Sequence, residues 1–512
     1  TGIGSSGQAI DTDVGTIAAQ TTASGGVFIN ELDALTIGVG SGGVSGITAA
    51  SGGSVDIDAG GMLSIATGSR VLAGGNATTL TLDATSMSLN AGSAGTETVQ
   101  NTGSGTITLT ATAGNITLDH HSVGAGSGTV SIDVGTQSIL AAQASGTAEI
   151  NAAGTVAFNA ATIGSNNNHV DLEGATELQI TDTGAGDMYL GEVTASTIQS
   201  TSITVGDVAY GTIIVDYFDT DFLAIDTNHL LYLVQHDASN RNFDYTALAG
   251  DVSVNSINTG IAATTVTAVD GAINESVSGT STNITTDGVL TLSATSGIGN
   301  TGAIDTNVGT LAAQTTDSGG VAIRDIGDVT VGSGAGGING VSAAIGGDVD
   351  LDALGTVTVA AASQVSGGGD GTAVTIDAGG IELQAGTSGN ESVNNSGDGT
   401  VTLTATASGI TLDNDSIGVG TGDLNLNANG QTIGVAQATA TAEITTGGVV
   451  NVDAAAVGSL TQSLDIDGAT ALTINDSGAG AMSFGEVGGQ TITATTITVG
   501  DVGYGSIDID YS

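Results

Sequence analysis

The sequence predicts an all-β fold, a right-handed parallel β-helix (β-solenoid) with coils of about 18–23 residues. Three observations support this prediction: short runs in which apolar and polar residues alternate, the complete absence of proline, and a long internal repeat. Alternation with a period of two is typical of strands, because successive side chains leave a strand on opposite faces. Proline cannot donate a ladder hydrogen bond, so a chain made almost entirely of interior strands excludes it.

The internal repeat has an offset of 294 residues. Residues 9–26 read AIDTDVGTIAAQTTASGG and residues 303–320 read AIDTNVGTLAAQTTDSGG, which differ at only three positions. At the same offset, ITVGDVAYG at 203–211 returns as ITVGDVGYG at 497–505. A unit that is written twice is expected to be one structural unit stacked twice.

The repeat divides the chain into three parts. Residues 1–217 form the first copy, residues 218–294 an irregular, aromatic-richer segment that returns to the β-helix, and residues 295–512 an incomplete second copy. We interpret the chain as an excerpt of a longer array, because the second copy stops where the first continues.

A shorter rhythm runs within each copy. Gly-Thr followed by alternating apolar residues recurs at Gly105, Gly128, Gly146 and Gly154. Comparable positions return after roughly 18–23 residues, which predicts roughly 24 coils in the chain. We expect glycine and asparagine at the corners of the coils, where a positive φ is often required.

The pattern IDTxVGTLxAxTT…GxIxIxxxxxxTVGS resembles the large exoproteins of the filamentous-haemagglutinin type. The resemblance covers nearly the whole chain except about 218–250. It implies a long right-handed parallel β-helix, an extracellular or cell-surface location, and a structural role in an adhesin. Other copies of the same chain or array, and cell-surface or matrix glycans, are the partners that it implies.

The charge of the chain excludes several classes of function. There is no lysine and there are three arginines against 52 acidic residues, for a net charge of −49. This sign of charge excludes nucleic acid as a partner, and a chain without lysine has no GxxxxGK phosphate loop. The longest strongly apolar stretch, 229–234, is far below the ~20 residues of a membrane span.

No catalytic residues are predicted, and we expect the protein not to be an enzyme. His120 and His121 are the only adjacent histidines, and none of the five histidines has HExxH spacing. Asn414 and Asp415 replace this pair in the second copy, so we interpret it as an exposed turn.

Acidic residues spaced two apart are the strongest chemical signal. At this spacing each set leaves one face of a strand, and carboxylates in register on neighbouring coils would be about 4.8 Å apart. Carboxylate oxygens suit Ca²⁺, the one cofactor that the sequence suggests. The alternative is a solvated acidic face that keeps the protein soluble. The candidate ligands are Asp348, Asp350, Asp352, Asp171, Glu173, Asp465 and Asp467, and the pairs Asp56/Asp58 and Asp508/Asp510 repeat the pattern.

The segment 218–250 departs from the rest of the sequence. With Tyr217 it holds six of the thirteen aromatic residues and one of the three arginines. It is either a lateral contact or ligand surface, or an irregular coil or loop packed on the solenoid. The candidate surface residues are Tyr217, Phe218, Phe222, Tyr232, Arg241, Phe243 and Tyr245.

The sequence therefore predicts a structural extracellular repeat protein, a segment of a giant cell-surface adhesin or surface fibre. A carbohydrate-binding or carbohydrate-cleaving β-helix is the first alternative, and a groove of aromatics and acids near 217–250 would favour it. A self-assembling filament or sheath subunit is the second alternative, and ordered contacts between chains would favour that one.

Overall fold

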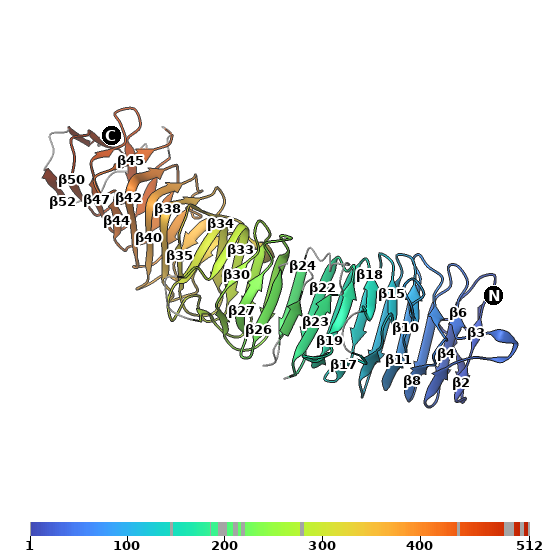
Figure 1. Cartoon of the computed structure of the whole chain (residues 1–512). Helices are drawn as coiled ribbons and strands as arrows, with labels where there is room; N and C mark the ends of the chain where they lie inside the picture. Colours follow the sequence, from blue (N-terminus) through green and yellow to red (C-terminus); the bar gives the residue numbers. More distant parts are fainter. Residues whose placement is uncertain are drawn as a thin grey trace. The chain divides into compact units, whose positions relative to one another are not determined.

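The computed structural model is all-β and consists of parallel strands stacked as a β-solenoid of about 18 turns (Figure 1). It describes residues 2–143, 147–184, 186–192, 202–207, 213–216, 221–276, 281–437, 441–485, 496–501 and 506–509. These residues form 53 strands and two three-residue 3₁₀ turns, Ser41–Gly43 and Ala335–Gly337. The chain has two compact units, Thr1–Leu248 and Ala249–Ser512. The predicted fold class is confirmed.

Most coils of the first unit contribute three short strands, and like strands of successive coils pair in parallel. The first column holds β1 (Ile10–Thr12), β4 (Val27–Glu31), β7 (Val55–Ala59), β10 (Thr79–Ala84), β13 (Thr106–Ala111), β16 (Val130–Asp133), β19 (Thr155–Ala160), β22 (Glu177–Asp182), β24 (Ser202–Asp207) and β28 (Asn242–Ala247). The second column holds β2 (Thr16–Ile17), β5 (Leu35–Ile37), β8 (Met62–Ile65), β11 (Ser86–Leu89), β14 (Ile116–Leu118), β17 (Ser138–Ala141), β20 (Thr162–Ile163) and β23 (Met188–Glu192). The third column holds β3 (Ala19–Gln20), β6 (Ile47–Thr48), β9 (Val71–Leu72), β12 (Val99–Asn101), β15 (Val123–Ala125), β18 (Ile150–Ala152) and β21 (Val170–Glu173).

An antiparallel insertion interrupts this pattern late in the first unit. Strand β25 (Ile213–Asp216) pairs antiparallel with β26 (Phe222–Asp226), which pairs antiparallel with β27 (Leu230–Gln235). The parallel column resumes at β28, which pairs directly with β24. The described part of the aromatic-richer segment therefore begins with antiparallel strands, β26 and β27.

The second unit repeats the three columns. Its first coils contain β29 (Val252–Val254), β30 (Ile257–Asn258), β31 (Thr264–Ala268), β32 (Ile273–Glu275), β33 (Ile284–Ala294) and β34 (Ile304–Thr315). Five long strands turn corners and serve two or three columns: β33, β34, β38 (Val349–Val359), β40 (Ala373–Leu383) and β42 (Thr400–Leu412). The remaining strands are β35 (Val321–Asp325), β36 (Val329–Val331), β37 (Gly340–Ser342), β39 (Gln364–Ser366), β41 (Val393–Asn395), β43 (Ile417–Val419), β44 (Leu424–Asn427), β45 (Thr432–Val435), β46 (Ile444–Thr446), β47 (Val449–Ala454), β48 (Ala456–Val457), β49 (Leu464–Asp467), β50 (Ala471–Asp476), β51 (Met482–Gly485), β52 (Thr496–Asp501) and β53 (Ile507–Ile509).

The coils vary in length more than the sequence predicted. Ile10 stacks on Ile29, whereas Met87 stacks on Ile116, so the second of these coils is about half as long again as the first. The predicted range of coil lengths is therefore too narrow, and the structure has fewer turns than predicted, about 18. Strand lengths vary as well, from two residues in β2 to thirteen in β42.

Alternating strands build the core in the way that the sequence predicted. In β10, Leu80 and Leu82 are fully buried, whereas Thr79 and Thr81 are more exposed. Inward side chains stack from coil to coil, as Leu80 does on Ile107. Fully burying an aliphatic side chain of this kind contributes about 1.5–3 kcal/mol. The second copy keeps the same register, with Val374 stacked on Val401.

Glycines at the Gly-Thr corners have a different role from the one expected. Gly105, Gly128 and Gly154 lie at equivalent corners of successive coils, and none of them has a positive φ. A Cβ atom at Gly128 would lie only 1.9 Å from the carbonyl oxygen of Gly105. Close approach between coils therefore requires these glycines. The expected positive φ occurs at other corners, such as Gly135 and Asn429, and Gly146 lies outside the described residues.

Candidate functional site

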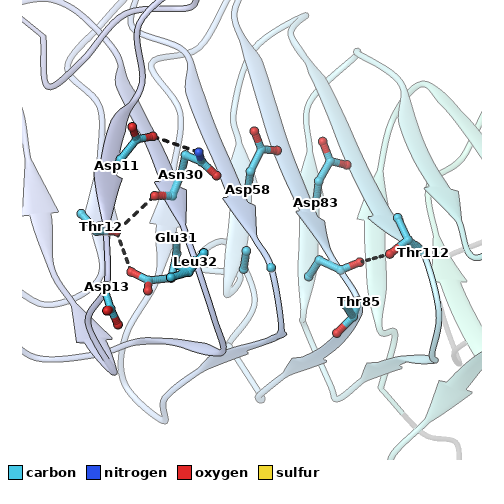
Figure 2. A pocket seen from close by; sticks show the side chains of 13 residues that line it. Asp11, Thr12, Asp13, Asn30, Glu31, Leu32, Asp58, Asp83, Thr85 and Thr112 are labelled. Carbon is cyan, nitrogen blue, oxygen red and sulfur yellow. Dashed lines mark hydrogen bonds between the residues drawn. The ribbon is translucent and has the colours of Figure 1, made fainter.

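A row of outward-facing polar side chains crosses the first four strands of the first column. Asp11, Asn30, Asp58 and Asp83 occupy equivalent positions on β1, β4, β7 and β10, as the strand registers show. Figure 2 shows their side chains next to one another on neighbouring strands. Parallel strands are about 4.8 Å apart, so Asp58 and Asp83 carry adjacent carboxylates in register.

Asp58 and Asp83 of this row lie close to a third carboxylate, that of Asp56 on β7, and the three repel one another. Asp56, Asp58 and Asp83 each place one carboxylate oxygen within 4.8 Å of the others. Burial, followed by repulsion from Asp56 and Asp83, raises the pKa of Asp58 above its ordinary value. Burial and the charge of Asp83 raise the pKa of Asp56 in the same way. The row therefore has an electrostatic cost that a cation would relieve.

A depression of about 810 Å³ lies over the row. Leu32, Thr85, Thr112 and Glu31 are among the residues that line it (Figure 2). The Thr12 hydroxyl donates to Glu31 at 2.6 Å, and the backbone N–H of Val14 donates to it at 3.0 Å. Burial alone would raise the pKa of Glu31, but these hydrogen bonds outweigh it and lower the pKa.

The second copy contains an equivalent row, in which an arginine replaces the asparagine of the first row. Asp305, Arg324, Asp352 and Asp377 are in register on β34, β35, β38 and β40. The Arg324 guanidinium contacts the Asp305 carboxylate at 2.6 Å and stands where the first copy has Asn30. Burial and repulsion from Asp350 and Asp377 raise the pKa of Asp352, and the charge of Arg324 opposes this rise. The second row thus holds its own cation, and the first has an amide in its place.

The structure brings together only some of the predicted calcium ligands. Asp350 and Asp352 leave the outer face of β38, but Asp350 lies opposite Thr375, whereas Asp352 lies opposite Asp377. Asp348 accepts a hydrogen bond from the backbone N–H of Ala373 at 2.8 Å. Of the pair Asp508/Asp510, Asp508 is exposed on β53 and Asp510 lies outside the described residues.

Sequence reasoning missed six members of the two rows: the acids Asp11, Asp83, Asp305 and Asp377, and the residues Asn30 and Arg324. Asp83 and Asp377 lack an acidic neighbour two positions away on their own strands, so the spacing rule did not select them. The repeat offset relates Asp83 to Asp377, but the sequence alone does not give the coil length that brings Asp58 opposite Asp83.

A second correction concerns the acids of β21 and β49. Asp171 is 1% exposed, so the prediction that it faces outward is wrong. It lies beside the buried Glu149, to which its backbone N–H donates at 2.7 Å. Asp465 has the same relation to Glu443, at 2.8 Å, and accepts a hydrogen bond from the Ser463 hydroxyl.

Unlike Asp171 and Asp465, the other acid of each pair does not lie opposite a carboxylate. Glu173 lies opposite Asn151, and Asp467 lies opposite Thr445. Because neither pair faces an outward acid on the preceding coil, we remove Asp171, Glu173, Asp465 and Asp467 from the candidate calcium ligands.

The predicted contact surface is also corrected in part. Arg241, Phe243 and Tyr245 are buried, so they belong to the core and not to an exposed surface. The two rings point inward from alternate positions of β28, and their centroids are 6.3 Å apart. Tyr232 on β27 is 54% exposed and Phe222 on β26 is partly exposed. Tyr217 and Phe218 lie outside the described residues.

The histidine pair lies in a turn, as the sequence predicted. His120 and His121 connect β14 to β15 and are partly exposed, and His121 has a φ of 52°. Asp415 holds the equivalent position in the second copy with a φ of 49°. The shared backbone geometry with different side chains indicates that the turn, and not imidazole chemistry, is common to both copies.

Comparisons with known proteins returned no relative. No protein-family model matches the chain, and neither a curated protein nor a solved structure matches it. Among the described residues, none of the helical segments has the length and apolar character needed to cross a membrane. The site thus offers a set of oxygen atoms that could coordinate a cation, and Asp58 and Asp83 are its two adjacent carboxylates in register.

Proposed function

We propose that the chain is a structural segment of an extracellular adhesin or surface fibre, in which the solenoid is the scaffold. The supporting observation is the equivalence of the two copies. Leu80 stacks on Ile107 in the first copy and Val374 on Val401 in the second, at the 294-residue offset. Each coil pairs with the next in the same way, so the solenoid can be lengthened by adding repeats. A protein of this kind can serve as a spacer in a surface fibre.

Immunogold labelling of intact producing cells with an antibody against the folded chain tests this proposal. We expect label on the cell periphery without permeabilisation. Label that appears only after permeabilisation would overturn the extracellular assignment. Incubation with polygalacturonate, chitin and cellulose, followed by a reducing-end assay, tests the enzymatic alternative, and release of sugar ends would replace the structural proposal with that one.

Calcium remains a prediction for the first row. Millimolar Ca²⁺ should raise the thermal unfolding midpoint more than NaCl of equal ionic strength, because carboxylate oxygens coordinate Ca²⁺ directly. A ligand that binds only the folded state adds up to about 2.7 kcal/mol at a hundred times its Kd. Differential scanning calorimetry in the two salts measures the difference.

The two rows supply their own controls. Asn30→Arg places a guanidinium in the first row and should reduce the calcium-specific increase, whereas Arg324→Asn removes the cation from the second row and should enlarge it. Equal midpoints in both salts, with no change in either variant, would mean that screening alone offsets the charge of the protein.

A further inference from the structure

Two glutamates in the third column are buried in the same way. Glu149 is 0% exposed and precedes β18, between Ser122 on the coil before it and Asp171 on the coil after it. Its Oε2 atom accepts the backbone N–H of Asp171 at 2.7 Å, and its Oε1 atom has no hydrogen-bond partner among the described residues. An ionised carboxylate with a buried, unsatisfied oxygen is costly, so this environment favours the neutral acid.

The second copy repeats the arrangement on a different set of coils. Glu443 is 1% exposed, precedes β46, and accepts the backbone N–H of Asp465 at 2.8 Å. Ser416 and Asp465 are its neighbours in register, as Ser122 and Asp171 are for Glu149. Because both copies bury a glutamate at the same position, the burial is a feature of the repeat and not of a single coil.

The groups that face these glutamates do not supply a compensating cation. Asp119 lies on the coil before Glu149 and Asp171 on the coil after it, and both repel a negative charge there. His121 lies in the turn of the preceding coil, where its backbone N–H donates to Ala148 at 2.8 Å. His169 lies near Gly191, on the far side of Asp171. Asp413 and Asp465 take the acidic positions around Glu443.

The electrostatic balance agrees with the geometry. Burial, followed by repulsion from Asp171 and Asp119 and opposed by backbone hydrogen bonds, raises the pKa of Glu149 from 4.5 to about 8. Burial and the charges of Asp465 and Asp413 raise the pKa of Glu443 to about 7. These two groups therefore hold protons at pH values where exposed carboxylates do not.

We propose that Glu149 and Glu443 act as proton-held locks: each keeps its coil closed as a neutral acid, and loss of the proton as the pH rises loosens that coil. Below pH 4.5 the carboxyl is protonated in both the folded and the unfolded chain, so its stability is fully present. Between pH 4.5 and about 8 the unfolded chain releases the proton from Glu149 while the folded chain retains it. The stability of the folded state therefore falls with rising pH across this window.

Hydrogen exchange of the native protein followed by mass spectrometry tests the locks without any substitution. From pH 5.5 to 9, protection factors of peptides covering 147–173 and 441–467 should fall at least tenfold more than those of 105–118, a stretch that contains no acidic residue. Equal changes in all three regions would overturn the proposal.

Two substitutions identify the groups responsible. Glu149→Gln and Glu443→Gln replace each acid by an uncharged amide of the same shape, so each should flatten the pH dependence of its own region only. Glu382→Gln removes an exposed carboxylate on β40 and is the control, expected to leave both profiles unchanged. If either amide variant retains the wild-type pH profile in its region, that glutamate is not the lock.

Discussion

Replacing Gly128 with alanine should destabilise the first unit by at least about 3 kcal/mol, at or above the upper end of ordinary overpacking. A Cβ atom there would lie 1.9 Å from the carbonyl oxygen of Gly105, which is a backbone atom that cannot rotate away. The coils must separate or the corner must distort, and either change breaks parallel ladder hydrogen bonds on both sides. Equilibrium unfolding in guanidinium, followed by circular dichroism, measures the loss as a lower midpoint.

The chain offers a repeat of this experiment and a control for it. Gly422 is the counterpart in the second copy, where a Cβ atom would lie 1.9 Å from the oxygen of Gly399, so Gly422→Ala should have a similar effect on the second unit. Gly15→Ala is the control, because nothing lies within 4 Å of its Cβ position and its φ is not positive. A Gly128→Ala protein with the midpoint of Gly15→Ala would show that the coils are not tightly apposed.

The strands and their buried faces could be predicted because period two is a local property. The burial alternation of β10 and β13 follows directly from TLTLDA and TITLTA. The equivalence of the two copies was also accessible, since a repeat at a fixed offset carries its strand registers with it. Local pattern and long repeat are both properties that a single sequence displays.

The rows of carboxylates could not be predicted because they depend on the length of each coil. Asp58 meets Asp83 only because the coil between them has the right length, and this length differs from one pair of neighbouring coils to the next. A shift of one residue would turn Asp83 toward the core face. Corner geometry sets the coil length, and the Gly, Ser and Asn residues of the corners fit several lengths.

The inward rings of β28 differ from the sequence prediction, which placed Phe243 and Tyr245 among the candidate residues of a contact surface. Phe243 and Tyr245 lie on the coil that follows the antiparallel insertion, and the Tyr245 hydroxyl meets Nδ1 of His229 at 2.8 Å. Their packing depends on β26 and β27, whose antiparallel pairing does not follow from alternation alone. Aromatic side chains are also buried away from the insertion, at Phe158 on β19 and Phe484 on β51, so inward rings are not confined to it.

Replacing Arg241 with methionine should cost about 3–5 kcal/mol, the usual loss when one partner of a buried ion pair is removed. The Arg241 guanidinium contacts the Asp221 carboxylate, and both side chains are almost completely buried. Asp221 also accepts the backbone N–H groups of Ala238 at 2.9 Å and Ser239 at 3.3 Å, so the pair ties the turn before β28 to the start of β26. Urea unfolding and hydrogen exchange across 221–247 measure the loss.

A second substitution distinguishes the effect of the unpaired Asp221 charge from the effect of losing the Arg241 side chain. Arg241→Met combined with Asp221→Asn removes the uncompensated charge and keeps an acceptor for the two backbone N–H groups, so it should recover most of the stability lost in the single variant. Arg324→Met is the surface control and should cost less than about 1 kcal/mol, because half of that side chain is exposed to solvent. If the double variant is no more stable than Arg241→Met, the loss comes from the packing of the arginine stem. Side-chain packing would then stabilise the insertion, and the charge of Asp221 would not require a cationic partner.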